Sequence, residues 1–183
     1  MRETEVTVND LVYPLFLVDG DNIQNPIQSM PGIHQLSLNN LLNEIEASMK
    51  LGLSAFVLFP AVDDRLKDKT ATYSYDPANF YLKAATAIKS RFPEACLISD
   101  VAMDPYSSDG HDGLVEDGNI LNDETLPILA KMAVAQAEAG FDIIAPSDMM
   151  DGRIGYIREE LDLNGFTGTG IMAYTAKYAS AFY

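Results

Sequence analysis

The sequence predicts an α/β fold in which parallel strands alternate with helices, as part of a (β/α) barrel. Short apolar runs alternate with longer amphipathic segments along all 183 residues, and no low-complexity linker divides them, so we expect one domain spanning residues 1–183. Within the runs, apolar residues do not alternate with polar ones, which is typical of strands buried on both faces. The dinucleotide-binding and P-loop fingerprints are absent from the sequence, which favours a barrel over an open doubly wound sheet.

The first predicted strand is the apolar run LVYPLFLV, residues 11–18. It stops at a turn signal that begins with Asp19. Pro14 lies inside the run and has no N–H to donate, so we expect it at an edge, at a bulge or at the start of the strand. Residues 21–35 are rich in proline and glycine and predict an irregular surface loop.

A helix and a second strand come next. Ser37 is a good amino-terminal cap, apolar residues follow at helical spacing, and Gly52 ends the helix. Residues 55–59 form the second predicted strand, which Pro60 is expected to stop. The charged segment 63–76 reads as a solvated loop in preference to an active-site lid.

The middle of the chain predicts a second helix over residues 77–91, with Pro77 near its first turn. The third strand covers residues 95–101 and contains Cys96, whose apolar neighbours indicate a buried, inert thiol. A polar, acidic loop follows at residues 104–113.

The last third continues the same alternation. Asn122 or Asp123 is expected to cap a third helix. A fourth strand at residues 141–145, a fourth helix within 154–163 and a fifth strand at 170–174 complete the pattern. Connections of this kind between parallel strands are right-handed.

Composition restricts the class of partner. The 27 acidic residues against 12 basic ones give a formal charge of −15, which argues against a nucleic-acid surface and against attraction to anionic membranes. The single cysteine excludes an intrachain disulfide and a cysteine-based zinc cluster. No signal-peptide pattern and no apolar run of about 20 residues is present, so a cytoplasmic setting is expected, with small molecules, cations or other subunits as partners.

Polar side chains follow the last two predicted strands and are expected to meet at the carboxyl edge of the sheet. Lys177 is the candidate catalytic residue, because an amine that attacks a carbonyl needs a pKa below the ordinary ~10.4. Arg153, which follows the preceding predicted strand, is a candidate for a cation that lowers the pKa of Lys177. The alternative is that Lys177 is an ordinary solvated surface lysine. Asp148 or Asp151 is expected to cap the next helix, which leaves Ser147 and Arg153 free to bind a carbonyl or carboxylate.

The loop after the third strand gathers oxygen ligands and one imidazole. Asp100, Asp104, Asp109, His111 and Asp112 lie within thirteen positions. Such a set suits Mg²⁺ better than zinc, which prefers thiolates and imidazoles. The alternative is an acidic loop that is only solvated.

Several segments resemble one enzyme family. The strongest are DVAMDPYSSDGHDG (residues 100–113), APSDMMDGR (145–153) and MAYTAKYASAFY (172–183), and NDLVYPLF (9–16) and SMPGIHQLS (29–37) agree with them. In combination they resemble porphobilinogen synthase, also called 5-aminolevulinate dehydratase, over essentially the whole chain.

The resemblance implies a (β/α)8 TIM barrel that condenses two molecules of 5-aminolevulinate into porphobilinogen, in tetrapyrrole and haem synthesis, through lysine Schiff bases. Family members form homo-oligomers, typically octamers. Lys177 matches one of the two Schiff-base lysines, Asp100 an active-site aspartate, and Ser147 with Asp148 the strand end that lines the substrate pocket. The expected substrate-binding residues are Asp100, Ser147, Asp148, Arg153 and Tyr183.

The resemblance also bears on the metal. Ala102, Asp104 and Asp112 stand where zinc-dependent members carry cysteines, so the chain looks like the zinc-independent type, with Mg²⁺ possible at Asp104 and Asp112. Asp109 replaces the histidine usual in the family. No organic cofactor is expected.

The predicted strands account for about five β/α units, a partial barrel. In the resembled family, a lid and a second Schiff-base lysine follow the segment that matches residues 172–183, and an assembly arm precedes the barrel. We therefore expect either a synthase completed by a further part or by partners, or a dehydratase-like binding or assembly module without full turnover.

Overall fold

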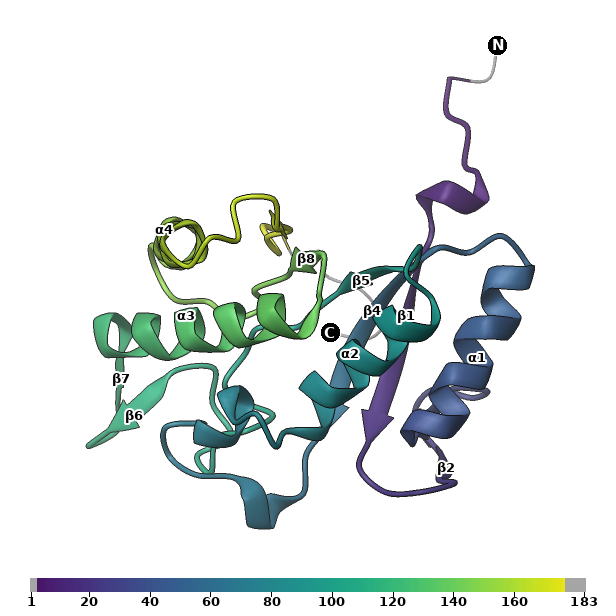
Figure 1. Ribbon diagram of the computed structural model, residues 1–183. Helices are drawn as coiled ribbons and strands as arrows, with labels where there is room; N and C mark the ends of the chain where they lie inside the picture. The colour runs from purple at the N-terminus through teal and green to yellow at the C-terminus, as the bar shows by residue number, and fades with distance from the viewer. Residues whose placement is uncertain (1–2, 177–183) are drawn as a thin grey trace.

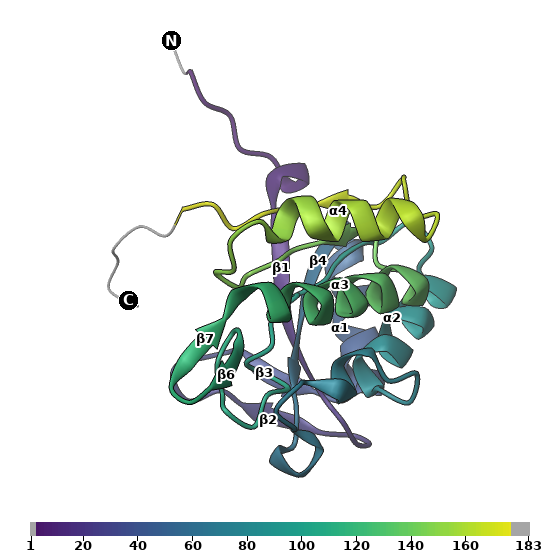
Figure 2. The same ribbon diagram turned by 90° about the vertical axis from the view of Figure 1, so that its left-hand side faces the viewer.

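The computed structural model describes residues 3–176. Its main sheet contains five parallel strands that lie side by side in chain order, and helices on one side of the sheet connect them (Figures 1 and 2). This confirms the predicted strand–helix alternation. The strands are β1 (Val12–Val18), β4 (Ala55–Ala61), β5 (Cys96–Ile98), β8 (Ile143–Ile144) and β9 (Gly170–Ile171), and the helices are α1 (Leu38–Lys50), α2 (Phe80–Arg91), α3 (Asn122–Ala139) and α4 (Arg153–Leu163).

Strands β1 and β4 form the longest pairing, from Val12 opposite Ala55 to Val18 opposite Ala61. Their alternate side chains enter different cores, because successive residues of a strand point to opposite faces. Leu58 packs against the helices, whereas its neighbour Val57 packs on the other face. The face toward the helices is buried, whereas the other face is buried around Val57, Ile98 and Ala145 but partly exposed on β1, so the prediction of strands buried on both faces holds only in part.

The described strands form an open arc with β2 (Gln24–Pro26) at one edge and β9 at the other, in the order β2-β3-β1-β4-β5-β8-β9. Strand β3 (His34–Leu36) runs parallel to β1, and β2 is antiparallel to β3. The prediction of an irregular loop at residues 21–35 was therefore wrong. Strands of three residues are too short to show a hydrophobic period.

A second hairpin, absent from the prediction, precedes α3. It pairs β6 (Leu114–Glu116) with β7 (Asn119–Leu121) through a turn at Asp117 and Gly118, whose φ angles are 48° and 77°. Positive φ at both positions is typical of a type I′ turn, for which Asp-Gly is a favoured pair. That dipeptide was the one local signal of the hairpin.

Some predicted boundaries shift. Strand β4 runs through Pro60, which has no N–H, because its pairing partner β5 already ends at Ile98, opposite Val57. Pro14 is tolerated for the same reason: β3 pairs only with Phe16 and Leu17, so β1 has no neighbour beside Pro14 on that side.

The second helix begins at Phe80, three residues after the expected Pro77. Asn79 provides the cap, since its side-chain oxygen accepts the Tyr81 N–H at 2.9 Å. The third helix starts at Asn122, but neither Asn122 nor Asp123 caps it; Leu121 occupies the cap position without a side-chain bond.

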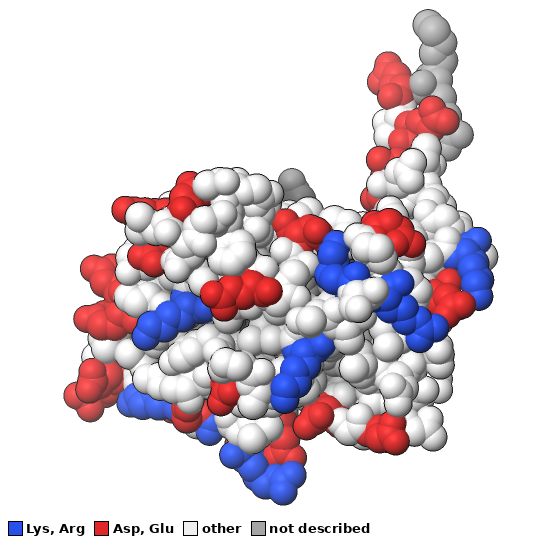
Figure 3. All heavy atoms as spheres, in the orientation of Figure 1, with Lys and Arg blue, Asp and Glu red and all other residues white. Residues whose placement is uncertain are grey.

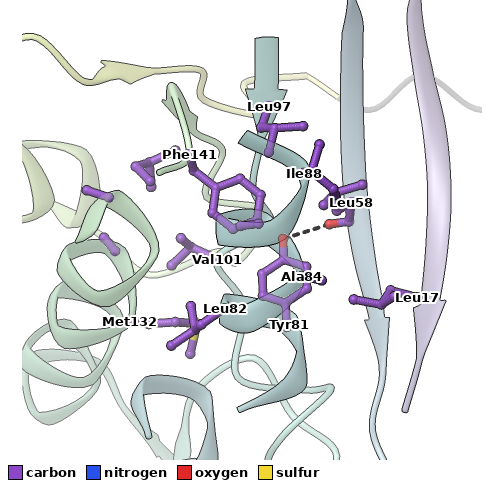
Figure 4. Close-up of a cluster of buried hydrophobic side chains, with 14 of the residues drawn as sticks. Leu17, Leu58, Tyr81, Leu82, Ala84, Ile88, Leu97, Val101, Met132 and Phe141 are labelled. Carbon is purple, nitrogen blue, oxygen red and sulfur yellow. Dashed lines mark hydrogen bonds between the residues drawn. The ribbon is translucent and has the colours of Figure 1, made fainter. Parts of the chain in front are cut away.

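The main core lies between the sheet and the helices. Tyr81, one of its two fully buried tyrosines among the described residues, stacks on Phe141 with ring centroids 5.1 Å apart (Figure 4). Leu58, Leu97 and Met132 surround this pair from the strands and α3. Helices α2 and α3 are thereby packed directly against the ends of β4 and β5.

Acidic side chains are spread over the face seen in Figure 3 and along the amino-terminal segment that projects ahead of β1, and basic ones are fewer. Within residues 3–176, no helix has the length and apolar character needed to cross a membrane.

Candidate active site

The carboxyl ends of β5 and β8 are joined beyond the strands themselves. The Val101 N–H donates to Ala145 O and the Ser147 N–H donates to Val101 O, both at 3.2 Å. This parallel bridge brings Asp100 beside Ser147, whose hydroxyl donates to Asp100 Oδ1 at 2.7 Å. The two predicted site residues, 47 positions apart in the sequence, are thus in contact.

Asp100 is held in an environment that disfavours its charge. Burial raises the pKa of its carboxyl to about 7, and the nearby carboxylates of Asp104, Asp112 and Asp148 act in the same direction, whereas the Ser147 hydrogen bond lowers it. Only 7% of the residue is exposed. Near neutral pH both protonation states of Asp100 are therefore populated, as a proton-transfer group requires.

Asp148 is buried next to Arg153. Burial raises the pKa of Asp148 to about 6, although the Met150 N–H and Arg153 both lower it. Arg153 Nε lies 3.3 Å from Asp148 Oδ2, yet neither buried atom has a hydrogen-bond partner. The Arg153 Nη1 donates to Met150 O at 2.9 Å. Arg153 is therefore paired, not free as expected.

The expected capping of α4 was wrong. Gly152, with a φ of 76°, occupies the cap position, and no side chain caps this helix. The Asp148 carboxylate instead closes the preceding turn by accepting the Met150 N–H at 2.8 Å. Asp151 donates its N–H to Asn122 Oδ1 at 2.7 Å, which ties this turn to the start of α3.

Asp104 and Asp112 form a carboxylate pair in the loop after β5. Burial raises the pKa of Asp104, the neighbouring Asp112 raises it further, and Lys67 lowers it. Two carboxylates are what proteins commonly offer Mg²⁺, which keeps several waters. Among residues 3–176 no group of three or more His, Cys, Asp or Glu side chains is arranged to hold a metal. The pair thus fits a water-rich Mg²⁺ site but not a site closed by protein ligands.

The other candidate residues of this loop have local roles. His111 Nδ1 accepts the Gly113 N–H at 3.1 Å. Asp109 donates its own N–H to Ser107 Oγ at 3.2 Å. Cys96 is partly buried, and burial followed by the charge of Asp142 raises the pKa of its thiol, which agrees with the expected inert thiol.

The loop at residues 63–76 is attached to the acidic loop by backbone bonds. Asp68 donates its N–H to Tyr106 O at 3.2 Å, and its carbonyl accepts the Ser108 N–H at 3.0 Å. The Asp68 carboxylate also accepts the N–H groups of Thr70 and Thr72. Lys67 is thereby held near the Asp104–Asp112 pair.

A cleft of ≈ 780 Å³ opens beside this region, at the carboxyl ends of β1 and β4. Its walls include Asp19, Asp63, Arg65 and Phe80, and none of the predicted site residues within 3–176 lines it. Lys177 and Tyr183, the predicted catalytic lysine and one predicted substrate ligand, lie outside the described residues, so their roles stay predictions.

Sequence reasoning missed two residues that contact Asp100. The Tyr81 hydroxyl accepts the Asp100 N–H at 3.0 Å, and Gln136 Nε2 donates to Asp100 O at 2.8 Å. Gln136 carried a usable signal, because it is a polar residue on the mostly apolar buried face of α3. Tyr81 carried none, since a tyrosine on an inner helix face reads as ordinary core.

Comparison with known proteins assigns the family. The family described as Delta-aminolevulinic acid dehydratase matches residues 1–183. The chain belongs to this family. Delta-aminolevulinic acid dehydratase of Bradyrhizobium diazoefficiens is 52% identical over 183 residues, which are all of this chain and 52% of the relative. The Chlamydia pneumoniae dehydratase is 49% identical, again over the whole chain and 55% of the relative.

A solved dehydratase structure agrees with the fold. The crystal structure of delta-aminolevulinic acid dehydratase (porphobilinogen synthase) from Toxoplasma gondii, in complex with the reaction product porphobilinogen, superposes with a TM-score of 0.95 at 49% identity. The match includes the whole of this chain and 52% of the Toxoplasma gondii chain. The chain thus spans about half the length of the dehydratases it matches, and its partial barrel is the corresponding part of their fold.

Proposed function

We propose that this chain carries part of the active site of a porphobilinogen synthase, which condenses two molecules of 5-aminolevulinate into porphobilinogen. The observation that carries the proposal is the Asp100–Ser147 contact at the joined ends of β5 and β8, in a chain whose whole length matches the dehydratase family. The related Toxoplasma gondii structure holds porphobilinogen, the product of this reaction.

In the proposed reaction Lys177 acts as the nucleophile. Its neutral amine attacks the keto carbon of 5-aminolevulinate, and loss of water leaves a protonated Schiff base. A Schiff base activates the neighbouring carbon for proton removal, which the condensation requires. The resemblance of residues 172–183 to the family motif supports this assignment.

Asp100 and Ser147 are proposed to handle the substrate amine and its proton. A carboxyl with a pKa of about 7 can accept a proton from an ammonium group and return it within one cycle near neutral pH. The Ser147 hydroxyl lies at hydrogen-bond distance and orients that carboxyl. Asp148, Arg153 and Tyr183 are proposed as further substrate-binding residues.

Three further features belong to the proposal. Asp104 and Asp112 would hold Mg²⁺, which would supply positive charge beside the acidic cluster and organise its waters. The chain would act in a homo-oligomer, since family resemblance implies one. A cytoplasmic location fits its single cysteine.

Schiff-base trapping tests the proposal directly. The chain is incubated with 5-aminolevulinate and borohydride and its intact mass is measured. We expect one reduced adduct on the native chain and none on Lys177→Ala. Lys50→Ala is the matched control, because Lys50 is an exposed lysine paired with Glu46 on α1. An adduct that persists in Lys177→Ala would assign the chemistry to another lysine.

Turnover is read with a colour reagent for pyrroles. Pyrrole formation that depends on Lys177 supports the synthase. An adduct without any pyrrole, with and without Mg²⁺, would instead favour the dehydratase-like binding module for this chain.

A further inference from the structure

The backbone of Asp100 is held by side chains from two helices. Its N–H donates to the Tyr81 hydroxyl at 3.0 Å, and its carbonyl accepts from Gln136 Nε2 at 2.8 Å. The Tyr81 hydroxyl in turn donates a hydrogen bond to Leu58 O at 2.8 Å, as Figure 4 shows. Tyr81, Gln136 and Leu58 are all fully buried.

The Tyr81 hydroxyl takes the place of one rung between β4 and β5. The first rung runs from the Cys96 N–H to Ser54 O at 2.8 Å. Because a parallel ladder advances by two residues on each strand, the third rung would join the Asp100 N–H to Leu58 O. Tyr81 Oη bonds to both of these groups, so it is inserted in that rung.

An inserted hydroxyl separates the two strands where the site begins. Regular β4–β5 pairing ends at Val57 opposite Ile98, one step before the inserted group. On its other side the β5 segment keeps its backbone bonds to β8, from Ser99 N to Ile143 O and from Val101 N to Ala145 O. Asp100 therefore stays aligned with Ser147 on the β8 side, while the Tyr81 hydroxyl separates it from Leu58 of β4.

Gln136 holds the other end of the Asp100 peptide, and this contact costs free energy of folding. Its Nε2 donates to the Asp100 carbonyl, whereas its Oε1 is buried without a hydrogen-bond partner. An unpaired buried amide oxygen disfavours folding, so an apolar side chain of equal size would suit the core of α3 better. What the amide provides is a donor for the Asp100 carbonyl.

We propose that Tyr81 and Gln136 are positioning residues that fix the Asp100 peptide, so that the Asp100 carboxyl meets the Ser147 hydroxyl. The consequence for catalysis rests on the proposed synthase function; the positioning itself does not. Both side chains are fully buried, so they would act on the reaction only through Asp100.

The test compares two variants with a matched control. Tyr81→Phe removes the inserted hydroxyl and keeps the ring, and Gln136→Met removes the donor at nearly constant volume. Tyr13→Phe is the control, since the Tyr13 hydroxyl bonds to Glu44 at 2.9 Å and has no contact with Asp100. Circular dichroism confirms that each variant is folded before it is measured.

The first readout needs no turnover. The chain is labelled with ¹³C at aspartate carboxyls, and the Asp100 signal is assigned by its loss in Asp100→Asn. Its titration is followed in EDTA, so that the charged groups facing it remain those of Asp104, Asp112 and Asp148. We expect the midpoint to fall by roughly one unit in Tyr81→Phe and in Gln136→Met, because burial is the largest cause of the raised pKa, and access to water outweighs the loss of the Ser147 hydrogen bond, which by itself would raise the pKa. The Tyr13→Phe midpoint stays at the native value. Native midpoints in both variants would overturn the proposal.

The second readout is pyrrole formation. We expect kcat to fall about 10-fold in both variants while KM changes less than about twofold, as for a displaced catalytic group. An equal loss in Tyr13→Phe would mean a general effect on folding and would contradict the proposal. If the native chain forms no pyrrole, the synthase function fails for this chain, and the carboxyl titration alone decides the positioning.

Discussion

At the scale of single residues, two buried carboxyls of the candidate site differ in their partners. Asp100 has the Ser147 hydroxyl, and Asp148 has the Arg153 guanidinium. In both, burial outweighs the partner and raises the pKa, to about 7 for Asp100 and about 6 for Asp148. A catalytic site needs such groups near neutrality, and the folded protein is less stable for having them.

Replacing Asp100 by asparagine is expected to stabilise the protein in alkaline solution. Its folded pKa lies above its unfolded one, so the folded state favours the neutral carboxyl. That advantage is complete below about pH 4 and is lost as the pH rises through 7. Asp100→Asn should therefore raise the free energy of unfolding by about 2–4 kcal/mol at pH 8 and change it little near pH 4.

Urea unfolding at several pH values measures this difference. Asp117→Asn, in the exposed β6–β7 turn, is the control and should show no such pH dependence. A constant effect of Asp100→Asn across the range would contradict the raised pKa.

Arg153→Met is expected to destabilise the protein most where Asp148 is charged. Because the pKa of Asp148 is raised to about 6 even with Arg153 beside it, removal of the cation raises it further. We expect a loss of about 2 kcal/mol at pH 8 that falls to less than half near pH 5, where Asp148 is protonated in both proteins. Arg65→Met, which breaks the exposed Asp63 pair, should have no measurable effect. The same loss for Arg153→Met at both pH values would show that the Arg153–Asp148 ion pair does not stabilise the turn between β8 and α4.

At the scale of elements, segments with a clear apolar pattern were predictable, including the short strands β5, β8 and β9, which lie within longer apolar runs, whereas short strands without such a run were not. Helices α1 and α3 match their apolar spacing, and β1 and β4 match their apolar runs. Strands β2, β3, β6 and β7 have three residues each, too few for a period of two to show.

Helix α2 shows how a cap can override a sequence signal. Pro77 is well suited to a first helical turn, yet the chain makes a turn there and the helix starts after Asn79. Asn79 is buried, its Oδ1 accepts the Tyr81 N–H at 2.9 Å, and its Nδ2 donates to Tyr73 O at 2.9 Å. The second bond depends on the preceding turn at residues 72–75, which the sequence did not predict.

Asn79→Ala should therefore lower the free energy of unfolding by about 2 kcal/mol, through loss of the cap and of the Nδ2 bond to Tyr73 O. Thermal unfolding measures the loss. The control is Asn164→Ala, because Asn164 is exposed at the end of α4 and bonds only to Glu160 O through its side chain. Equal losses in the two variants would mean that Asn79 contributes no more than a surface asparagine. Since α2 also carries Tyr81, this cap helps to place the group that holds Asp100.

At the scale of the whole molecule, the predicted topology was enough to locate the candidate site but not to predict the contacts between its side chains. Parallel strands in chain order bring their carboxyl ends to one edge, which is why residues after the third and fourth predicted strands meet. The contact between Asp100 and Ser147 depends on a backbone bridge that no pattern records. The pairing of Arg153 with Asp148 and the insertion of Tyr81 between strands depend likewise on side-chain packing across elements.

The overall charge of −15 predicts that any salt stabilises the chain by screening, whereas a site at Asp104 and Asp112 predicts an extra effect of Mg²⁺. Thermal unfolding in roughly 10 mM MgCl₂ is compared with NaCl of equal ionic strength. With a dissociation constant of about 1 mM, Mg²⁺ adds about 1.4 kcal/mol, or roughly 3–5 °C for a domain of this size.

Asp104→Asn should abolish the Mg²⁺ increment and keep the response to NaCl, because it removes one of the two carboxylates but only one charge of the many on the chain. Asp117→Asn, which removes one exposed charge outside that loop, in the β6–β7 turn, should keep both responses. If the extra stabilisation by Mg²⁺ remained in Asp104→Asn, it would come only from the stronger screening by a divalent ion, and the proposed site would be contradicted. The acidic loop would then be a solvated loop whose charges raise the pKa of Asp100.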